Sequence, residues 1–137
     1  MSRGFQKTSA IALAAGYSTD LLNTGKIHLF KNNLAPNDNT VLADLIEADY
    51  NGYLAGGVAV PLWPAPYWLS DDGLVHTTTN HQFQATDGVN PNIIYGYYIT
   101  DKNGLLVYAA NLGVPFNMAD AFSALILDAD VAFGVAF

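Results

Sequence analysis

The side chains in this sequence that could do chemistry are few, and their spacing decides what chemistry is available. The 137 residues include three histidines, twelve acidic residues with a single glutamate, and no cysteine. Without cysteine, disulfides, thiolate-bound zinc and thiol catalysis are excluded. The remaining candidates are acid–base or metal chemistry by histidine and carboxylate, stacking by tryptophan, and attraction of an acidic surface by basic residues near the N-terminus.

The carboxylates do not predict a hydrolase. A glycosidase needs two carboxylates in different environments within one cleft. Glu47 is predicted on a short surface helix, whereas residues 71–72, Asp128 and Asp130 stand in turn-like sequences, where aspartate bonds to the backbone. We therefore expect no catalytic residues and no enzymatic activity.

The histidines predict neither a metal site nor a nucleophilic triad. His76 and His81 are five residues apart, so a regular strand points them to opposite faces. His28 could join one of them across a sheet, but no carboxylate stands at a metal-ligand spacing. Ser70, Asp71 and His76 lack the Gly-x-Ser-x-Gly turn of a nucleophile elbow. The sequence also has no EF-hand pattern and no glycine-rich phosphate loop, so we expect no metal and no cofactor.

An aromatic cluster brings both tryptophans within six residues. Trp63, Tyr67 and Trp68 could stack on sugar rings, anchor a protein partner, or fold over one end of the protein and close its core. Tryptophan and tyrosine are enriched at protein interfaces, which favours core closure or subunit contact over sugar binding. We assign these three side chains to a subunit interface.

Charge is scarce and unevenly placed. Charged residues make up 12% of the chain and hydrophobic residues 51%, so we expect other subunits or a partner to cover part of the apolar surface. Four basic residues oppose one acid in the first 31 residues, a net +3, whereas residues 32–137 carry one lysine against eleven acids, a net −10. Arg3, Phe5 and Lys7 are therefore predicted to tether the protein to an acidic protein surface.

The same balance restricts the partners. A net charge of −7 argues against binding nucleic acid, and four basic residues are too few for strong counterion release. No apolar run reaches the roughly 20 residues that a membrane span needs. We expect neither nucleic acid nor a membrane as partner.

Strands must position most of these residues. Alternating apolar residues between turn sequences predict strands over residues 26–31, 57–62, 75–83, 93–100, 105–110, 122–127 and 131–137. Thr40 is predicted to cap a helix of at most two turns over residues 41–46. Asp101 and Gly104 predict a type I turn in a hairpin, and Asp128–Asp130 predict a break between the last two strands.

The final predicted strand is apolar to its last residue. Val131, Phe133, Val135 and Phe137 are large, whereas the residues between them are small. An apolar strand must be covered by its own sheet or by a neighbour's. We assign Phe133, Val135 and Phe137, with the aromatic cluster, to the subunit interface.

Together these patterns predict an all-β fold. It is an antiparallel β-sandwich or jelly roll with one short helix and an extended N-terminal arm. The arm is residues 1–24 and the sandwich domain is residues 25–137.

Two stretches of the sequence resemble small structural proteins of tailed bacteriophages. The first is Ile27-His28-Leu29-Phe30-Lys31-Asn32-Asn33, followed by Pro36, Thr40, Leu42-Ala43-Asp44-Leu45, Glu47-Ala48 and Gly52-Tyr53. The second is Tyr95-Gly96-Tyr97-Tyr98-Ile99-Thr100-Asp101 with Gly104-Leu105-Leu106. In size and predicted class the chain is similar to the jelly-roll proteins that cement phage heads, which is an analogy of fold.

The resemblance implies a non-enzymatic capsid decoration protein. It would be made in the host cytoplasm, bind between subunits of the major capsid protein on the virion surface, and stabilise the mature head. Self-association as a dimer is expected, and the N-terminal arm would reach along the capsid. The alternative is a tail- or fibre-associated sandwich module that binds host glycan or a neighbouring tail protein. A small hydrolase using Asp71 and His76 is the third possibility.

Overall fold

The protein folds almost entirely into strands. The computed structural model describes residues 25–59, 68–69, 74–121 and 123–134, which exclude the predicted arm. Seven strands and one 3-10 helix lie in these ranges: β1 (Lys26–Phe30), η1 (Leu42–Asp44), β2 (Val58–Ala59), β3 (Trp68–Leu69), β4 (Leu74–Gln84), β5 (Asn92–Thr100), β6 (Leu106–Met118) and β7 (Ala124–Gly134).

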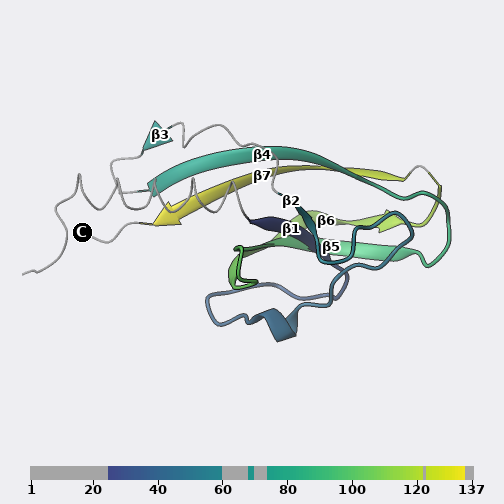
Figure 1. Ribbon diagram of the computed structural model, residues 1–137, viewed down its shortest axis with the longest axis horizontal. Coiled ribbons are helices and arrows are strands. Elements are labelled where there is room, and N and C mark those ends of the chain that lie inside the picture. Colours follow the sequence, from purple (N-terminus) through teal and green to yellow (C-terminus); the bar gives the residue numbers. More distant parts are fainter. Residues whose placement is uncertain (1–24, 60–67, 70–73, 122, 135–137) are drawn as a thin grey trace, which may run out of the picture.

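The strands form two antiparallel sheets that face each other (Figure 1). One sheet has four strands in the order β2-β1-β5-β6, and the other has three in the order β3-β4-β7. All strand pairs are antiparallel. The predicted all-β, antiparallel, sandwich-like class is confirmed, while the jelly-roll topology stays a prediction.

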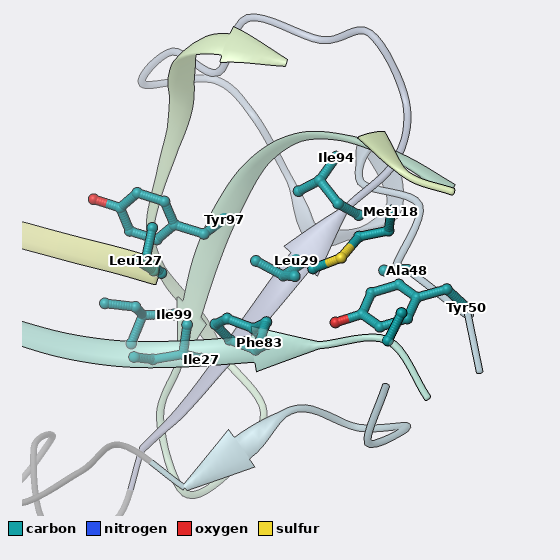
Figure 2. Packing of buried hydrophobic residues seen from close by; sticks show 11 residues of the cluster. Ile27, Leu29, Ala48, Tyr50, Phe83, Ile94, Tyr97, Ile99, Met118 and Leu127 are labelled. Atoms are coloured by element: carbon teal, nitrogen blue, oxygen red, sulfur yellow. The ribbon is translucent and has the colours of Figure 1, made fainter. Parts of the chain in front are cut away.

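The core lies between the two sheets (Figure 2). Ile27 and Leu29 of β1 and Ile99 of β5 have no exposed surface and point toward Phe83 of β4 and Leu127 of β7. Burying each of these large side chains contributes about 1.5–3 kcal/mol. The alternation of apolar residues along β1 therefore fixes which face of the four-stranded sheet meets the other sheet.

The opposite face of the four-stranded sheet is covered as well. The chain between β1 and β2 crosses this face, and its Leu45 packs with Phe30 of β1 and Tyr98 of β5 in a second cluster. Phe30 pairs with Gly96 of β5, which leaves room for its ring. A Cβ at Gly96 would collide with that ring and with the carbonyl oxygen of Ala110.

The β4–β7 ribbon is the longest paired element. Its register runs from Leu74 opposite Gly134 to Gln84 opposite Ala124 without interruption. The end that contains Phe83 lies over the four-stranded sheet, and the other end continues past that sheet (Figure 1). The predicted break at residues 128–130 is therefore wrong, because these residues pair with residues 78–80 and are held extended.

The short helix predicted over residues 41–46 is present but shorter than this range. Only Leu42–Asp44 are helical, in a single 3-10 turn. Thr40 does not cap it, because its hydroxyl instead accepts a hydrogen bond from the Asn37 backbone N–H at 2.9 Å. Local spacing of apolar residues was the signal for this helix, and tertiary pairing overrides it.

That pairing joins the following segment to the end of β1. Lys31 N donates to the Ile46 carbonyl at 2.8 Å, and Ala48 N donates to the Leu29 carbonyl at 2.9 Å. Between these bonds Glu47 forms an isolated antiparallel bridge with Phe30. Glu47 consequently stands in extended chain against the sheet rather than on a surface helix.

The predicted hairpin between β5 and β6 is confirmed, although β6 extends to Met118 rather than to Ala110. Gly104 N donates to the Asp101 carbonyl at 3.0 Å, and the Asp101 carboxylate accepts from Leu105 N at 2.9 Å. Gly104 has a φ of +80°, which glycine adopts without strain.

Replacing Gly96 by alanine tests the close packing under Phe30. We expect Gly96→Ala to lower the free energy of unfolding by about 1–3 kcal/mol, because the new methyl group overpacks the site. Gly113→Ala in β6 is the matched control, since a Cβ there meets no atom within 4 Å. Urea unfolding of both variants provides the measurement, and equal stabilities would contradict this packing.

Candidate functional site

The structure describes only part of the predicted binding surfaces. Arg3, Phe5 and Lys7, the predicted arm residues, lie outside the described residues, as do Trp63, Tyr67, Val135 and Phe137.

Two predicted interface positions fall within described strands. Trp68 lies opposite His76 in the β3–β4 pair, and Phe133 lies opposite Val75 in the β4–β7 pair. The backbone thus brings Trp68 and Phe133 to the same end of the three-stranded sheet, on either side of β4. Their assignment to a subunit interface stays a prediction.

The polar cluster comprises four side chains joined by hydrogen bonds: His28, Glu47, Tyr53 and Thr100. His28 Nδ1 lies 2.6 Å from Glu47 Oε2, and His28 Nε2 lies 2.8 Å from Thr100 Oγ1. The Tyr53 hydroxyl donates to the same Glu47 oxygen at 2.7 Å and accepts from Leu29 N at 3.2 Å. These bonds connect three distant parts of the sequence.

Strand geometry places the members of this cluster. His28 lies on the outer face of β1 because Ile27 and Leu29 occupy the inner face. Thr100 ends β5, and the bridge between Phe30 and Glu47 brings the carboxylate over that face. Burial of His28 and Thr100 then makes their mutual hydrogen bond necessary, since an unpaired buried polar group is costly.

A glycine allows the neighbouring loop to approach His28. A Cβ at Gly57 would lie 2.7 Å from His28 Nδ1, closer than any side chain permits. Gly57 also has a φ of +86°, a left-handed conformation that favours glycine. The chain can therefore close over the imidazole at this position.

Aromatic rings and burial shape the electrostatics of the polar cluster. The Tyr98 ring stacks on the His28 imidazole, with centroids 4.4 Å apart and planes 1° from parallel. Burial raises the pKa of Tyr98 to about 12, and the Glu47 carboxylate acts in the same direction. Burial, followed by its hydrogen bond to Glu47, also raises the pKa of Tyr53. Both phenols are therefore un-ionised at neutral pH, and the Tyr53 hydroxyl donates to Glu47.

Thr100, His28 and Glu47 stand in the order of a nucleophile, a base and an orienting carboxylate. They adjoin an open pocket of about 430 Å³ whose lining includes Lys26 and Lys102. Thr100, however, is only 4% exposed. Acyl transfer also needs a pair of donors aimed at the developing oxyanion. Near this cluster the Gly56 N–H points at Glu47 Oε1 instead, at 3.4 Å. The geometry favours a role in fixing the covering chain to the sheet.

His81 differs from His28 in its surroundings. His81 is half-buried in β4, in edge-to-face contact with Phe83, and burial lowers its pKa. Within the described ranges no three His, Asp or Glu side chains gather as metal ligands. The described residues also include no helix long and apolar enough to cross a membrane.

An apolar groove lies beside β6. It has a volume of about 660 Å³ and runs between residues 36–42 and residues 104–109. Val41, Leu42 and Leu105 line it and are 56%, 43% and 64% exposed. Among the described residues, Asp38 is the one charged residue that lines the groove, and most of the other lining residues are apolar.

Comparison with known proteins gives no match: no protein-family model, no curated protein and no solved structure corresponds to the chain.

Sequence reasoning missed the polar cluster, although parts of its signal were visible. The alternation along β1 places His28 on the face opposite the core, and Glu47 is the only glutamate in the chain. The separations of 19 residues from His28 to Glu47 and 72 from His28 to Thr100 lie beyond any local pattern. The pairing of β1 with β5 and the bridge between Phe30 and Glu47 bring these side chains together.

Removal of the Glu47 carboxylate tests whether the polar cluster fixes the covering chain. We expect Glu47→Ala to lower the free energy of unfolding by about 2–3 kcal/mol, because it leaves His28 and Tyr53 without their acceptor. Glu47→Gln keeps one oxygen and should lose less. Asp38→Ala removes an exposed carboxylate as the control, and chemical denaturation compares all three. A Glu47→Ala protein as stable as the control would disprove the role.

The raised pKa of Tyr98 predicts a pH dependence. The unfolded phenol ionises near pH 10, whereas the folded one stays protonated to about pH 12. The stabilisation that the un-ionised Tyr98 phenol contributes is therefore fully present below pH 10 and is lost as the pH rises toward 12. Tyr98→Phe should reduce the slope by about one proton equivalent. Urea unfolding across this range measures the difference, and parallel curves for the two proteins would refute the assignment.

Proposed function

We propose that the protein is a non-enzymatic bacteriophage capsid decoration protein that binds between major capsid subunits and stabilises the mature head. The observation that carries the proposal is the exposed apolar surface of a chain with few charges. Nine large apolar side chains among the described residues are 43–79% exposed, while charged residues are only 12% of the sequence. Where such exposed apolar residues gather into a patch, they are typical of sites that bind other proteins.

Part of this surface is concentrated rather than scattered. Val41, Leu42 and Leu105 meet at the apolar groove beside β6. Single exposed apolar residues are ordinary on any protein, but a groove that gathers three of them offers a partner a continuous contact. A subunit seated there would remove them from water together.

The β4–β7 ribbon also favours a role in an assembly. Its outer end passes beyond the four-stranded sheet, and among the described strands only the two-residue β3 pairs with it there (Figure 1). Ribbons of two or three strands are marginal without packing against another layer. Contact with a neighbouring capsid subunit would supply that layer.

The stretches that resemble phage structural proteins fold into one unit. The first contains β1 and the chain that covers it, and the second contains most of β5. These strands pair directly, from Lys26 opposite Thr100 to Phe30 opposite Gly96. The two stretches that resemble phage structural proteins therefore build a single region of the fold. This supports the proposal that the resemblance reflects a shared architecture.

The mechanism of stabilisation is mass action. A protein that binds the assembled shell but not its separate subunits stabilises the shell by an amount set by its concentration relative to its dissociation constant. The body supplies apolar contacts, and the basic segment with Arg3, Phe5 and Lys7 would attach to an acidic surface of the neighbouring subunits. No chemical step is required of any residue.

Copy number in purified particles tests the proposal. We expect quantitative mass spectrometry to give a ratio to the major capsid protein near one, or another simple lattice fraction. A ratio of a few per cent would contradict shell decoration and favour the alternative tail module with Trp63, Tyr67 and Trp68 on glycan. Absence from particles would refute both.

In the same preparation, a chain lacking residues 2–10 should bind shells more weakly while its body unfolds as before.

A further inference from the structure

One long strand edge of the protein is unpaired among the described strands. β6 is the last strand of the four-stranded sheet and runs for 13 residues. Natural proteins usually protect such an edge with charged residues, because its free N–H and C=O groups can pair with another chain. Here residues 105–119 contain no acidic, basic or histidine side chain. This edge therefore has no charge to oppose pairing.

The sequence of β6 limits where pairing can occur. Pro115 has no backbone N–H, and Gly113 lacks a side chain to pack, so the second part of the strand is a poor template. The first part, residues 106–112, has neither proline nor glycine. It also borders the apolar groove, whose far wall includes Val41 and Leu42. A strand added at this part would gain backbone hydrogen bonds and an apolar wall.

We propose that β6 pairs with β6 of a second copy of this chain, antiparallel about a two-fold axis at Ala109. The two four-stranded sheets would then form one continuous eight-stranded sheet. A two-fold pairing brings the same surface of both copies together, which is the usual symmetry of a homodimer. Each residue a given number of positions before Ala109 in one copy then faces the residue the same number of positions after Ala109 in the other copy.

This register matches a large residue with a small one at two of the four pairs that flank the axis, while Leu106 faces Leu112 and Val107 faces Asn111 at the other two. Tyr108 would face Ala110 of the other copy, and Leu105 would face Gly113. Ala109 would face its own symmetry mate, with little bulk at the axis. None of these pairs contains a charged side chain. The pairing therefore places no like charges directly opposite each other, an arrangement that would be destabilising.

Charge restricts where two copies can meet. Each copy carries a net charge of −7, so two copies repel each other over most approaches. The uncharged strand is where they can meet without placing acidic side chains face to face. This interface differs from the one assigned to Trp68 and Phe133, and pairing does not require a capsid. A chain that fails to bind shells can still dimerise.

Sedimentation equilibrium of the full chain tests the pairing. The double variant Leu105→Lys/Asn111→Lys places two exposed positive charges on the edge, and we expect it to raise the dimer dissociation constant by about tenfold or more. The control Leu54→Lys/Asn33→Lys makes the same residue changes at exposed positions away from β6 and should leave it unchanged. A monomeric wild-type chain, or equal dissociation constants for the two variants, would overturn the proposal.

A cross-link tests the register independently. Because the chain has no cysteine, Ala109→Cys introduces a single thiol. Directly opposed Cβ atoms in an antiparallel pair are about 4.5–5.5 Å apart, close to the geometry of a disulfide. Mild oxidation should give a covalent dimer for Ala109→Cys and none for Asn33→Cys. A dimer in which Ala109→Cys stays uncrosslinked would overturn the two-fold pairing about this residue.

Discussion

The pairing of β1 with β5 is the constraint on which the rest of the structure depends. β1 has only five residues, and the last four are buried, two on each face of the sheet. A strand covered on both faces normally carries only apolar residues. Here one buried position is His28, so the chain that covers the outer face must bring an acceptor for its imidazole. Glu47 meets that need, and Tyr53 and Gly57 are placed by the same requirement.

This requirement explains why the covering chain departs from its local preferences. Residues 41–46 have helical spacing, yet the segment turns once and then runs extended along the end of β1. A continued helix would not place Glu47 opposite Phe30. The energy of one buried hydrogen-bond network and one apolar cluster thus exceeds the small preference of a six-residue segment for helix.

How much of the structure could be predicted from the sequence depends on how far along the chain each sequence signal acts. Alternating apolar residues predicted the bounds of β1, β4 and β5 closely, and the turn residues Asp101 and Gly104 predicted the hairpin. Both signals act within a few residues. The prediction of a strand break at residues 128–130 was wrong, because aspartates, which favour turns, are also tolerated in a strand that has a long partner. The polar cluster could not be predicted, since its members meet only through the topology. The apolar surplus of the composition indicated exposed apolar surface without saying where on the fold it would lie.

The distance along the chain between β1 and its partner has a consequence for how the protein folds. Lys26 pairs with Thr100, so β1 can pair with β2 and with the segment around Glu47 early, but its other neighbour, β5, is made only when most of the chain has been synthesised. Contacts this far apart in sequence fold slowly, because a long loop must close before they form. On the ribosome the apolar residues of β1 would wait exposed while some seventy further residues are added. The outer face of β1 can be covered by the segment that follows it, whereas its inner face stays in water until β4, β5 and β7 have been made.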